Sequence, residues 1–268
     1  MNEISLENID NALSLLAKIH QPDENCSSFS VFGSYARNRL KVPRDVDCIV
    51  LVERIPNPLS VRQVISSQSG FDFVGMSDDS YRYRCQSIEY GIVYRLENKF
   101  LGEIEDITAG KRFPLEISKP LWAIGGNIPE VIIGDIAESI ILFDKDKKLT
   151  ELKAELQSKY PKKLRDTLLK MLGEEISLKL DISEKLCLEK NYLAADVGIA
   201  DLVIALSRYL FAKNEVYIPS IKHIRTHLMS RQSKISHQRL EKFVQILENG
   251  SSEEKLICIK KMFKENER

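Results

Sequence analysis

The run from Ser28 to Val52 constrains the fold more than any other part of the chain. It begins with the short β-branched and aromatic segment Ser30–Phe32, which stops at Gly33-Ser34, and residues of helix-compatible composition follow until Pro43. This pattern predicts a strand, a tight turn and a short helix. A glycine lets the backbone of such a turn approach a ligand, and the free N–H groups that open a helix favour phosphate. Gly33 and Ser34 are therefore candidate phosphate-binding residues.

Two acidic residues, Asp45 and Asp47, begin the second strand that this run predicts, which continues through Cys48–Val52. Side chains alternate along a strand with period two, so both carboxylates are expected on one face. Carboxylates held side by side repel each other unless a cation lies between them. Two hard oxygen ligands favour Mg²⁺, with substrate phosphates filling the remaining positions of its coordination shell. The alternative is a surface strand with two solvated aspartates beside an ordinary glycine turn.

The order Gly33-Ser34, ten residues, Asp45-x-Asp47 resembles the signature of the DNA polymerase β-like nucleotidyltransferase superfamily. The resemblance is closest to small bacterial members such as the aminoglycoside and lincosamide nucleotidyltransferases, although many relatives have Gly where Asn38 stands. It implies that Asp45 and Asp47 hold two Mg²⁺ ions, one activating the attacking oxygen and the other neutralising the leaving pyrophosphate. It also implies that Gly33-Ser34 bind the terminal phosphates of a nucleotide, with Arg37 as a further contact.

The superfamily's third metal carboxylate lies on a following strand between apolar residues. The alternating, Tyr-, Ile- and Val-rich sequence from Gly70 to Leu96 predicts further strands of the same sheet. Within it Ile88-Glu89-Tyr90 is the best match, so Glu89 is a candidate metal ligand and general base. Asp72 is the main rival, and an exposed strand glutamate without a role is the alternative.

The remaining pattern predicts an α+β chain with two domains. An amphipathic helix is expected over residues 3–20, and the apolar run Val131–Phe143 is also read as a helix. The charge run at 145–148 marks the predicted boundary between a nucleotidyltransferase domain with a small mixed β-sheet, residues 1–145, and an all-α helical bundle, residues 146–268. The helices expected in the bundle span residues 149–159, 161–190, 191–213, 219–230, 236–248 and 252–265.

Charge is distributed unevenly between these halves. Residues 1–145 carry 15 Lys and Arg against 21 Asp and Glu, whereas residues 146–268 carry 24 against 18. An acidic metal-binding half with a basic half suits a polyanionic substrate, and two halves that merely attract each other are the alternative.

The segment Asn214–Lys222 resembles the Asn, Tyr, Pro and Lys stretch of the C-terminal helical domains of small-molecule nucleotidyltransferases. The resemblance implies that Lys222 reaches the triphosphate and that Tyr217 lines the acceptor pocket. A loop between helices with one exposed lysine is the alternative.

Together these features favour a magnesium-dependent adenylyltransferase-like enzyme that transfers AMP from ATP to a hydroxyl of a small acceptor, such as an aminoglycoside-like antibiotic. A tRNA end or a protein hydroxyl is a second acceptor class, and a non-catalytic nucleotide-binding regulator is a third hypothesis. Nucleic acid is not favoured, because no dense Arg/Lys patch is present. No apolar run approaches the roughly 20 residues of a membrane span, and five widely spaced cysteines are typical of reduced residues, so a cytoplasmic location is expected.

Overall fold

The structure is a computed structural model that describes residues 5–37, 43–68, 70–77, 80–111, 128–219, 224–225 and 237–267. The chain divides into two compact units. The first comprises residues 1–105 and 135–159, and the second comprises residues 106–134 and 160–268. Both units are therefore discontinuous in sequence, and each is described by itself.

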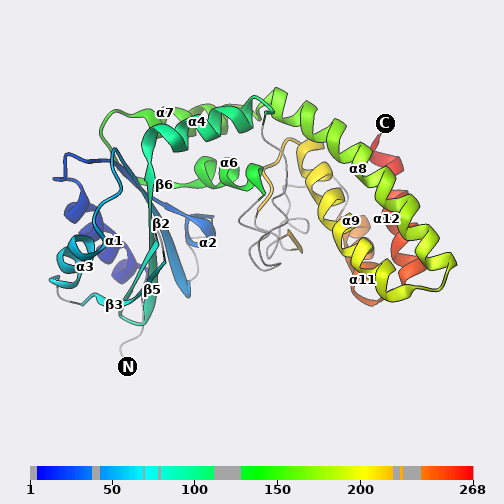
Figure 1. Ribbon diagram of the computed structural model, residues 1–268, viewed down its shortest axis with the longest axis horizontal. Coiled ribbons are helices and arrows are strands. Elements are labelled where there is room, and N and C mark those ends of the chain that lie inside the picture. Colours follow the sequence, from blue (N-terminus) through cyan, green and yellow to red (C-terminus); the bar gives the residue numbers. More distant parts are fainter. Residues whose placement is uncertain are drawn as a thin grey trace. The chain divides into compact units, whose positions relative to one another are not determined.

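The described part of the first unit contains a six-stranded sheet with the order β3-β4-β5-β2-β1-β6 (Figure 1). The strands are β1 Cys26–Phe32, β2 Asp45–Val52, β3 Asp72–Ser77, β4 Ser80–Cys85, β5 Ile88–Leu96 and β6 Ile140–Asp144. The pair β2 and β5 is parallel, and the other neighbours are antiparallel. The sheet is thus mixed, and the α+β class predicted from the sequence is confirmed.

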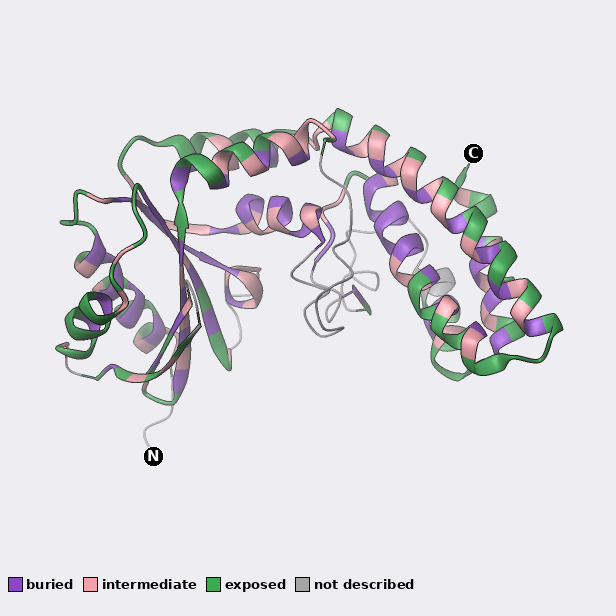
Figure 2. Ribbon diagram, viewed as in Figure 1, coloured by how far each residue is buried: buried purple, intermediate pink, exposed green. Residues whose placement is uncertain are grey.

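Strands β2, β4 and β5 alternate between buried and more exposed residues over much of their length, and the buried residues belong to a core that helices cover. The helices α1 Leu6–His20 and α3 Pro58–Ser66 lie side by side at one face (Figure 1). The short α2 Gly33–Arg37 follows β1 and contacts β1 and β2, and its Tyr35 hydroxyl donates to Asp10 of α1. The core between the sheet and α1 is apolar and rich in tyrosine, and β1 is buried at every residue (Figure 2). The first unit also contains α7 Lys148–Ser158.

The described helices of the second unit are α8 Lys162–Leu188, α9 Tyr192–Lys213, α11 His237–Asn249 and α12 Ser252–Glu267. Long helices α8 and α9 pack against each other, and α12 packs against both (Figure 1). Their close contact depends on Gly198 of α9, because a Cβ there would lie 2.6 Å from Ser183 Oγ of α8. Two helices, α4 Glu97–Thr108 and α6 Pro129–Glu138, contain residues of both units.

The predicted helix over Val131–Phe143 is wrong in its second half. Helix α6 ends at Glu138, and β6 begins at Ile140. The run Ile140–Asp144 adds to the free edge of β1, where Phe29 pairs with Phe143. Pairing of the backbone with this edge satisfies its N–H and C=O groups, so tertiary context overrides the helical pattern.

The division of function between a catalytic domain 1–145 and a helical domain 146–268 stays a prediction. The compact units of the structure have other boundaries. Helix α7 follows the predicted boundary yet belongs to the first unit. Most of the helix predicted over 219–230 lies outside the described residues. The five cysteines are all free, and none of the helices in the described part has the length and hydrophobicity needed to cross a membrane.

Candidate functional site

Asp45 and Asp47 lie at the start of β2 and point away from the apolar core. Their neighbours Val46 and Cys48 are buried, whereas both aspartates are exposed. Asp47 pairs in register with Phe32, the last residue of β1, so the turn that follows Phe32 begins directly beside Asp47. The alternation predicted from the sequence therefore brings the carboxylates to one face, next to the predicted phosphate turn.

Two glycines flank the carboxylate of Asp47. Gly33 has a φ of +72°, and a Cβ at this position would lie 2.7 Å from Asp47 Oδ2. Gly91 of β5 is the register partner of Asp47, and a Cβ there would lie 3.5 Å from Oδ1. Any side chain at Gly33 would be strained by the backbone and would collide with the carboxylate. The glycine of the turn thus lets β1 and α2 approach Asp47 closely.

Arg37, at the end of α2, makes two ion pairs with α6. Its Nη2 donates to Asp135 Oδ1 at 2.7 Å, and its Nε lies 2.7 Å from Glu138 Oε2. The Arg37 side chain is only 9% exposed, so these pairs are screened less than surface pairs. Its predicted role as a phosphate contact stays a prediction, and the structure adds two carboxylate partners that the sequence reasoning missed.

Asp135, the partner of Arg37 Nη2, is mostly buried, with 20% of its side chain exposed. Burial raises the pKa of Asp135 to about 6, Arg37 opposes this shift, and the negative charges of Glu138 and Asp47 add to it. Ser34, a predicted phosphate-binding residue of the Gly33-Ser34 turn, is half-buried at the second position of α2.

Glu89 lies beside Asp45, while Asp72 does not. Asp45 and Glu89 are register partners in the parallel pair of β2 and β5. Asp72 begins β3, and strands β4 and β5 separate it from β2, which amounts to about 14 Å at the usual strand spacing. The structure thus brings one of the two rival carboxylates to the aspartate pair, although the role of Glu89 as a metal ligand and base stays a prediction.

Two arginines of β4 hold Glu89 in the structure. Arg82 Nη1 donates to Glu89 Oε1 at 3.2 Å, and Arg84 Nη2 lies 3.9 Å from Oε2. Both arginines are more than half exposed, so the pairs are weak and exchangeable. A cation that binds Asp45 would compete with them for the Glu89 carboxylate.

The carboxylate oxygens at this face suit a hard cation whose remaining coordination positions are filled by a substrate. Among the residues that the structure describes, no three His, Cys, Asp or Glu side chains are grouped so as to hold a metal ion. Mg²⁺ takes one or two protein carboxylates and fills its remaining positions with water and phosphate oxygens. Exposed Asp45 and Asp47, with glycines leaving space around Asp47, fit that requirement.

Tyr217 lies in the second unit, where it packs against other residues of the same unit. Its ring stacks on Tyr160 with 4.9 Å between centroids, and a Cβ at Gly134 would lie 2.8 Å from Tyr217 Cβ. Nearby in sequence, Lys222 falls outside the described residues. The acceptor-lining role of Tyr217 and the phosphate role of Lys222 stay predictions.

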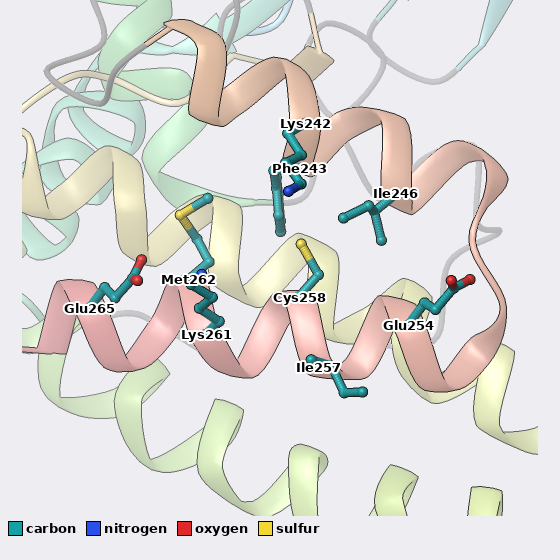
Figure 3. A pocket seen from close by; sticks show the side chains of 9 residues that line it. All are labelled: Lys242, Phe243, Ile246, Glu254, Ile257, Cys258, Lys261, Met262 and Glu265. Atoms are coloured by element: carbon teal, nitrogen blue, oxygen red, sulfur yellow. The ribbon is translucent and has the colours of Figure 1, made fainter.

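A groove of about 570 Å³ lies between α11 and α12 and does not include the predicted site residues (Figure 3). Its floor is apolar, with Phe243, Ile246 and Met262, and its rim carries Lys242 and Glu254. The groove belongs to the second unit, whereas the aspartate pair belongs to the first.

Comparison with known families finds no family description that matches this chain, and no curated protein is similar to it. Among solved structures, the chain is similar to a nucleotidyltransferase-like protein from Exiguobacterium sibiricum. The likeness has a TM-score of 0.49 and 13% sequence identity, and it covers 96% of this chain and 75% of that chain.

Proposed function

We propose that the chain is a metal-dependent nucleotidyltransferase that moves a nucleoside monophosphate, AMP from Mg-ATP in the first instance, to a hydroxyl of a small acceptor. The supporting observation is the arrangement of Asp45 and Asp47 on one exposed face, with Gly33 and Gly91 leaving space around the Asp47 carboxylate. The alternative of two solvated surface aspartates does not require the positive φ and the close approach that Gly33 provides.

In this proposal Asp45 and Asp47 hold one or two Mg²⁺, and Glu89 joins them when its pairs with Arg82 and Arg84 open. The bound ions supply charge neutralisation of the departing pyrophosphate and lower the pKa of the attacking hydroxyl. Asp45 and Asp47 are the residues that would hold these ions, on the exposed face beside the Gly33-Ser34 turn. The carboxylate of Glu89, beside Asp45, takes the proton from the acceptor hydroxyl.

Phosphate binding falls to the Gly33-Ser34 turn, which begins α2. The N–H and hydroxyl of Ser34 contact the terminal phosphates, and Arg37 offers Nη1, since its Nη2 and Nε face carboxylates of α6. Lys222 is a further phosphate contact in this proposal, and Tyr217 lines the acceptor site.

A single assay separates the acceptor classes. Purified protein is incubated with Mg²⁺ and each α-labelled nucleoside triphosphate, and label transfer is measured with an aminoglycoside panel, with total tRNA and with cell protein. We expect ATP with a small hydroxylated acceptor to give transfer and pyrophosphate, consistent with a cytoplasmic enzyme that confers antibiotic resistance. Transfer to tRNA or protein would keep the chemistry and change the acceptor, and nucleotide binding without pyrophosphate release would make the chain a regulator.

The substitution Asp47→Asn tests the metal assignment. We expect it to abolish transfer, because an amide is a poor Mg²⁺ ligand, while the melting temperature holds or rises as repulsion from Asp45 is relieved. Pyrophosphate release and thermal unfolding are measured in parallel, with Asp72→Asn as the control at the far side of the sheet. Near-normal turnover in Asp47→Asn would show that the pair holds no catalytic cation.

A further inference from the structure

The face of the sheet that carries the aspartate pair continues across β5 onto β4. Two rows of register partners run across these three strands, and each row ends in an arginine: Asp45, Glu89 and Arg84, then Asp47, Gly91 and Arg82. Side chains of register partners lie on the same face of a sheet, and the ion pair between Arg82 and Glu89 agrees with this. Both arginines therefore lie on the face of the metal-binding carboxylates.

The sheet surface on either side of Arg82 is open. Gly91 separates Arg82 from Asp47 within its row, and Gly75 of β3 is the register partner of Arg82 on the other side. A Cβ at Gly75 would meet no atom of the described residues within 4 Å. At the usual strand spacing β4 lies about 10 Å from β2. A small molecule that reaches from Asp47 to Arg82 therefore crosses only a glycine in this row.

The two arginines carry more positive charge than their partner neutralises. Arg82 Nη1 donates to Glu89 Oε1 at 3.2 Å, and Arg84 Nη2 lies 3.9 Å from Oε2, so one carboxylate serves two guanidinium groups. Within the described part of the chain neither arginine pairs with a second carboxylate. Their side chains are 64% and 55% exposed, and each guanidinium has five N–H donors, so most of these donors remain available to a ligand.

The proposed role of Glu89 leaves the arginines without their partner. When Glu89 joins the cation at Asp45, Arg82 and Arg84 hold two positive charges with no carboxylate between them. A phosphate monoester carries about 1.5 to 2 negative charges near pH 7, and a guanidinium can bind two of its oxygens at once. The pair of arginines therefore matches a phosphate monoester in both charge and hydrogen-bond donors.

The order of the strands assigns these arginines to the acceptor and not to the nucleotide. The Gly33-Ser34 turn, which binds the terminal phosphates in the proposed function, follows β1 on one side of β2. The arginines lie on the other side of β2, beyond β5. Because the metal-binding carboxylates lie between these two regions, a ligand that contacts the arginines approaches them from the side away from the triphosphate.

We propose that Arg82 and Arg84 bind a phosphate group of the acceptor and thereby release Glu89 for its role beside Asp45. The inference rests on the proposed function and narrows its small acceptor to a hydroxyl compound that carries a phosphate monoester. The distance of about 10 Å between β4 and β2 suits a molecule of the size of a sugar phosphate. Acceptor binding and the availability of the base are coupled, because the phosphate and Glu89 compete for the same guanidinium groups.

The first experiment titrates the full chain with inorganic phosphate, without Mg²⁺ or nucleotide, and follows the Nε–H signals of the arginines by NMR. We expect Arg82 and Arg84 to reach half-saturation at about tenfold lower phosphate than Arg62, because a single exposed guanidinium binds an anion weakly. Arg62 is the internal reference, since it lies 4.6 Å from the centroid of the Phe73 ring, which packs against the core on the other face. Half-saturation of all three signals at the same concentration would overturn the proposal.

The same titration on two variants tests the competition with Glu89. Glu89→Gln removes the carboxylate that phosphate must displace, so we expect phosphate to bind at Arg82 about tenfold more tightly. Asp72→Asn is the matched control, because Asp72 is the register partner of Arg84 on β3 and its loss removes the same charge from the neighbouring strand. We expect less than about a twofold change in this control. Equal tightening in both variants would show a general charge effect and would overturn the competition.

Transfer assays test the link to the acceptor. Label transfer from Mg-ATP is measured with ribose 5-phosphate, with ribose as its unphosphorylated counterpart, and with the acceptor found by screening. We expect a phosphorylated acceptor, and we expect Arg82→Gln to lower its kcat/KM about tenfold or more while the Kd of Mg-ATP changes less than about twofold. A preferred acceptor without a phosphate group would overturn the proposal. If the wild type neither binds Mg-ATP nor releases pyrophosphate, the proposed function fails, and the phosphate titration still decides whether the two arginines form a phosphate site.

Discussion

At the scale of single residues, Glu89 and Asp72 give a direct comparison. We expect Glu89→Gln to lower kcat about a hundredfold or more, the scale of a positioned base, and Asp72→Asn to change it little. The structure supplies the reason, since Glu89 is the register partner of Asp45 and Asp72 lies three strands away from β2. Steady-state kinetics on both variants measure the effect, and the reverse order would transfer the role to Asp72.

His20 gives the first unit a pH-dependent stability. Its Nδ1–H donates to the carbonyl oxygen of Leu16 at 2.7 Å, and its Nε2 accepts from the hydroxyl of Tyr94 at 2.7 Å. Burial lowers the pKa of His20 below its ordinary value, and the hydrogen bond to Leu16 and the charge of Asp23 oppose that shift only in part. The neutral ring is therefore the form that the folded chain holds.

Because the folded-state pKa of His20 is depressed, its contribution to stability is present above about pH 6.5 and is lost as the pH falls. We expect the unfolding free energy of the wild type to decrease between pH 7.5 and pH 5 more steeply than that of His20→Gln, which cannot be protonated. Urea unfolding at several pH values measures both slopes. Identical slopes would show that protonation of His20 is not coupled to unfolding.

The sequence predicted those site residues whose placement follows from the alternation of side chains along one strand. It missed contacts between segments that lie far apart in the chain. Asp45 and Asp47 share a face because they lie two apart on a strand, which the sequence shows directly. The partners of Arg37 come from α6, about a hundred residues away, and one sequence does not reveal such a pairing. The only available signal was the spacing of Asp135 and Glu138, which puts both on one side of a helix.

At the scale of elements, two helical glycines should respond to alanine in opposite ways. Gly134 of α6 has no space, since a Cβ would lie 2.8 Å from Tyr217 Cβ in the same unit, so we expect Gly134→Ala to destabilise by about 1–3 kcal/mol. Gly102 of α4 is exposed with nothing within 4 Å, so Gly102→Ala should stabilise by about 0.5–1 kcal/mol. Thermal unfolding of the two variants tests the sign, and stabilisation in both would mean that Tyr217 moves aside at little cost.

The ends of a helix could be predicted where a capping residue and the hydrophobic period indicated the same position. Where the period gave no clear signal, the predicted end was wrong. Helix α1 begins and ends close to the predicted 3–20, because Ser5 caps it through Asn8 N–H. The run from Val131 to Phe143 is apolar throughout, so periodicity alone does not separate a buried helix from a strand. The separating signal was the β-branched and aromatic run that follows Ser139, whose hydroxyl caps the end of α6 at Ile136.

At the scale of the whole molecule, the unit boundaries predict how fragments behave. A fragment ending at residue 145 loses α7, whose Leu149 and Leu156 are buried and whose Lys153 donates to Ser139 O at 2.6 Å. We expect the fragment 1–159 to be more stable than 1–145 by about 3–6 kcal/mol, the value of burying two leucines. Proteolysis and thermal unfolding of the two fragments test this, and equal stability would place α7 outside the first unit.

The predicted boundary at residue 145 followed composition, because the charge run there resembles a linker. Composition does not show that residues 106–134 group with the helices of the second unit. Ile128 and Val131 pack with Phe211 and Ile218, and Glu130 forms a buried ion pair with Arg208, with 2.6 Å between Oε1 and Nε. Such long-range partners decide which segments form one unit, and a reading along the chain cannot supply them.

Strand β6 is synthesised long after β1 and β2, so one edge of β1 has no partner strand during much of translation. Strand β1 lies between β2 and β6, so one of its edges stays open until residue 144 has emerged from the ribosome. At ordinary elongation rates the interval between the end of β2 and the end of β6 is on the order of 5–20 s. An open edge on a fully buried strand is a template for pairing between nascent chains on one polysome. Soluble yield should therefore depend on how quickly the segment through Asp144 follows β2.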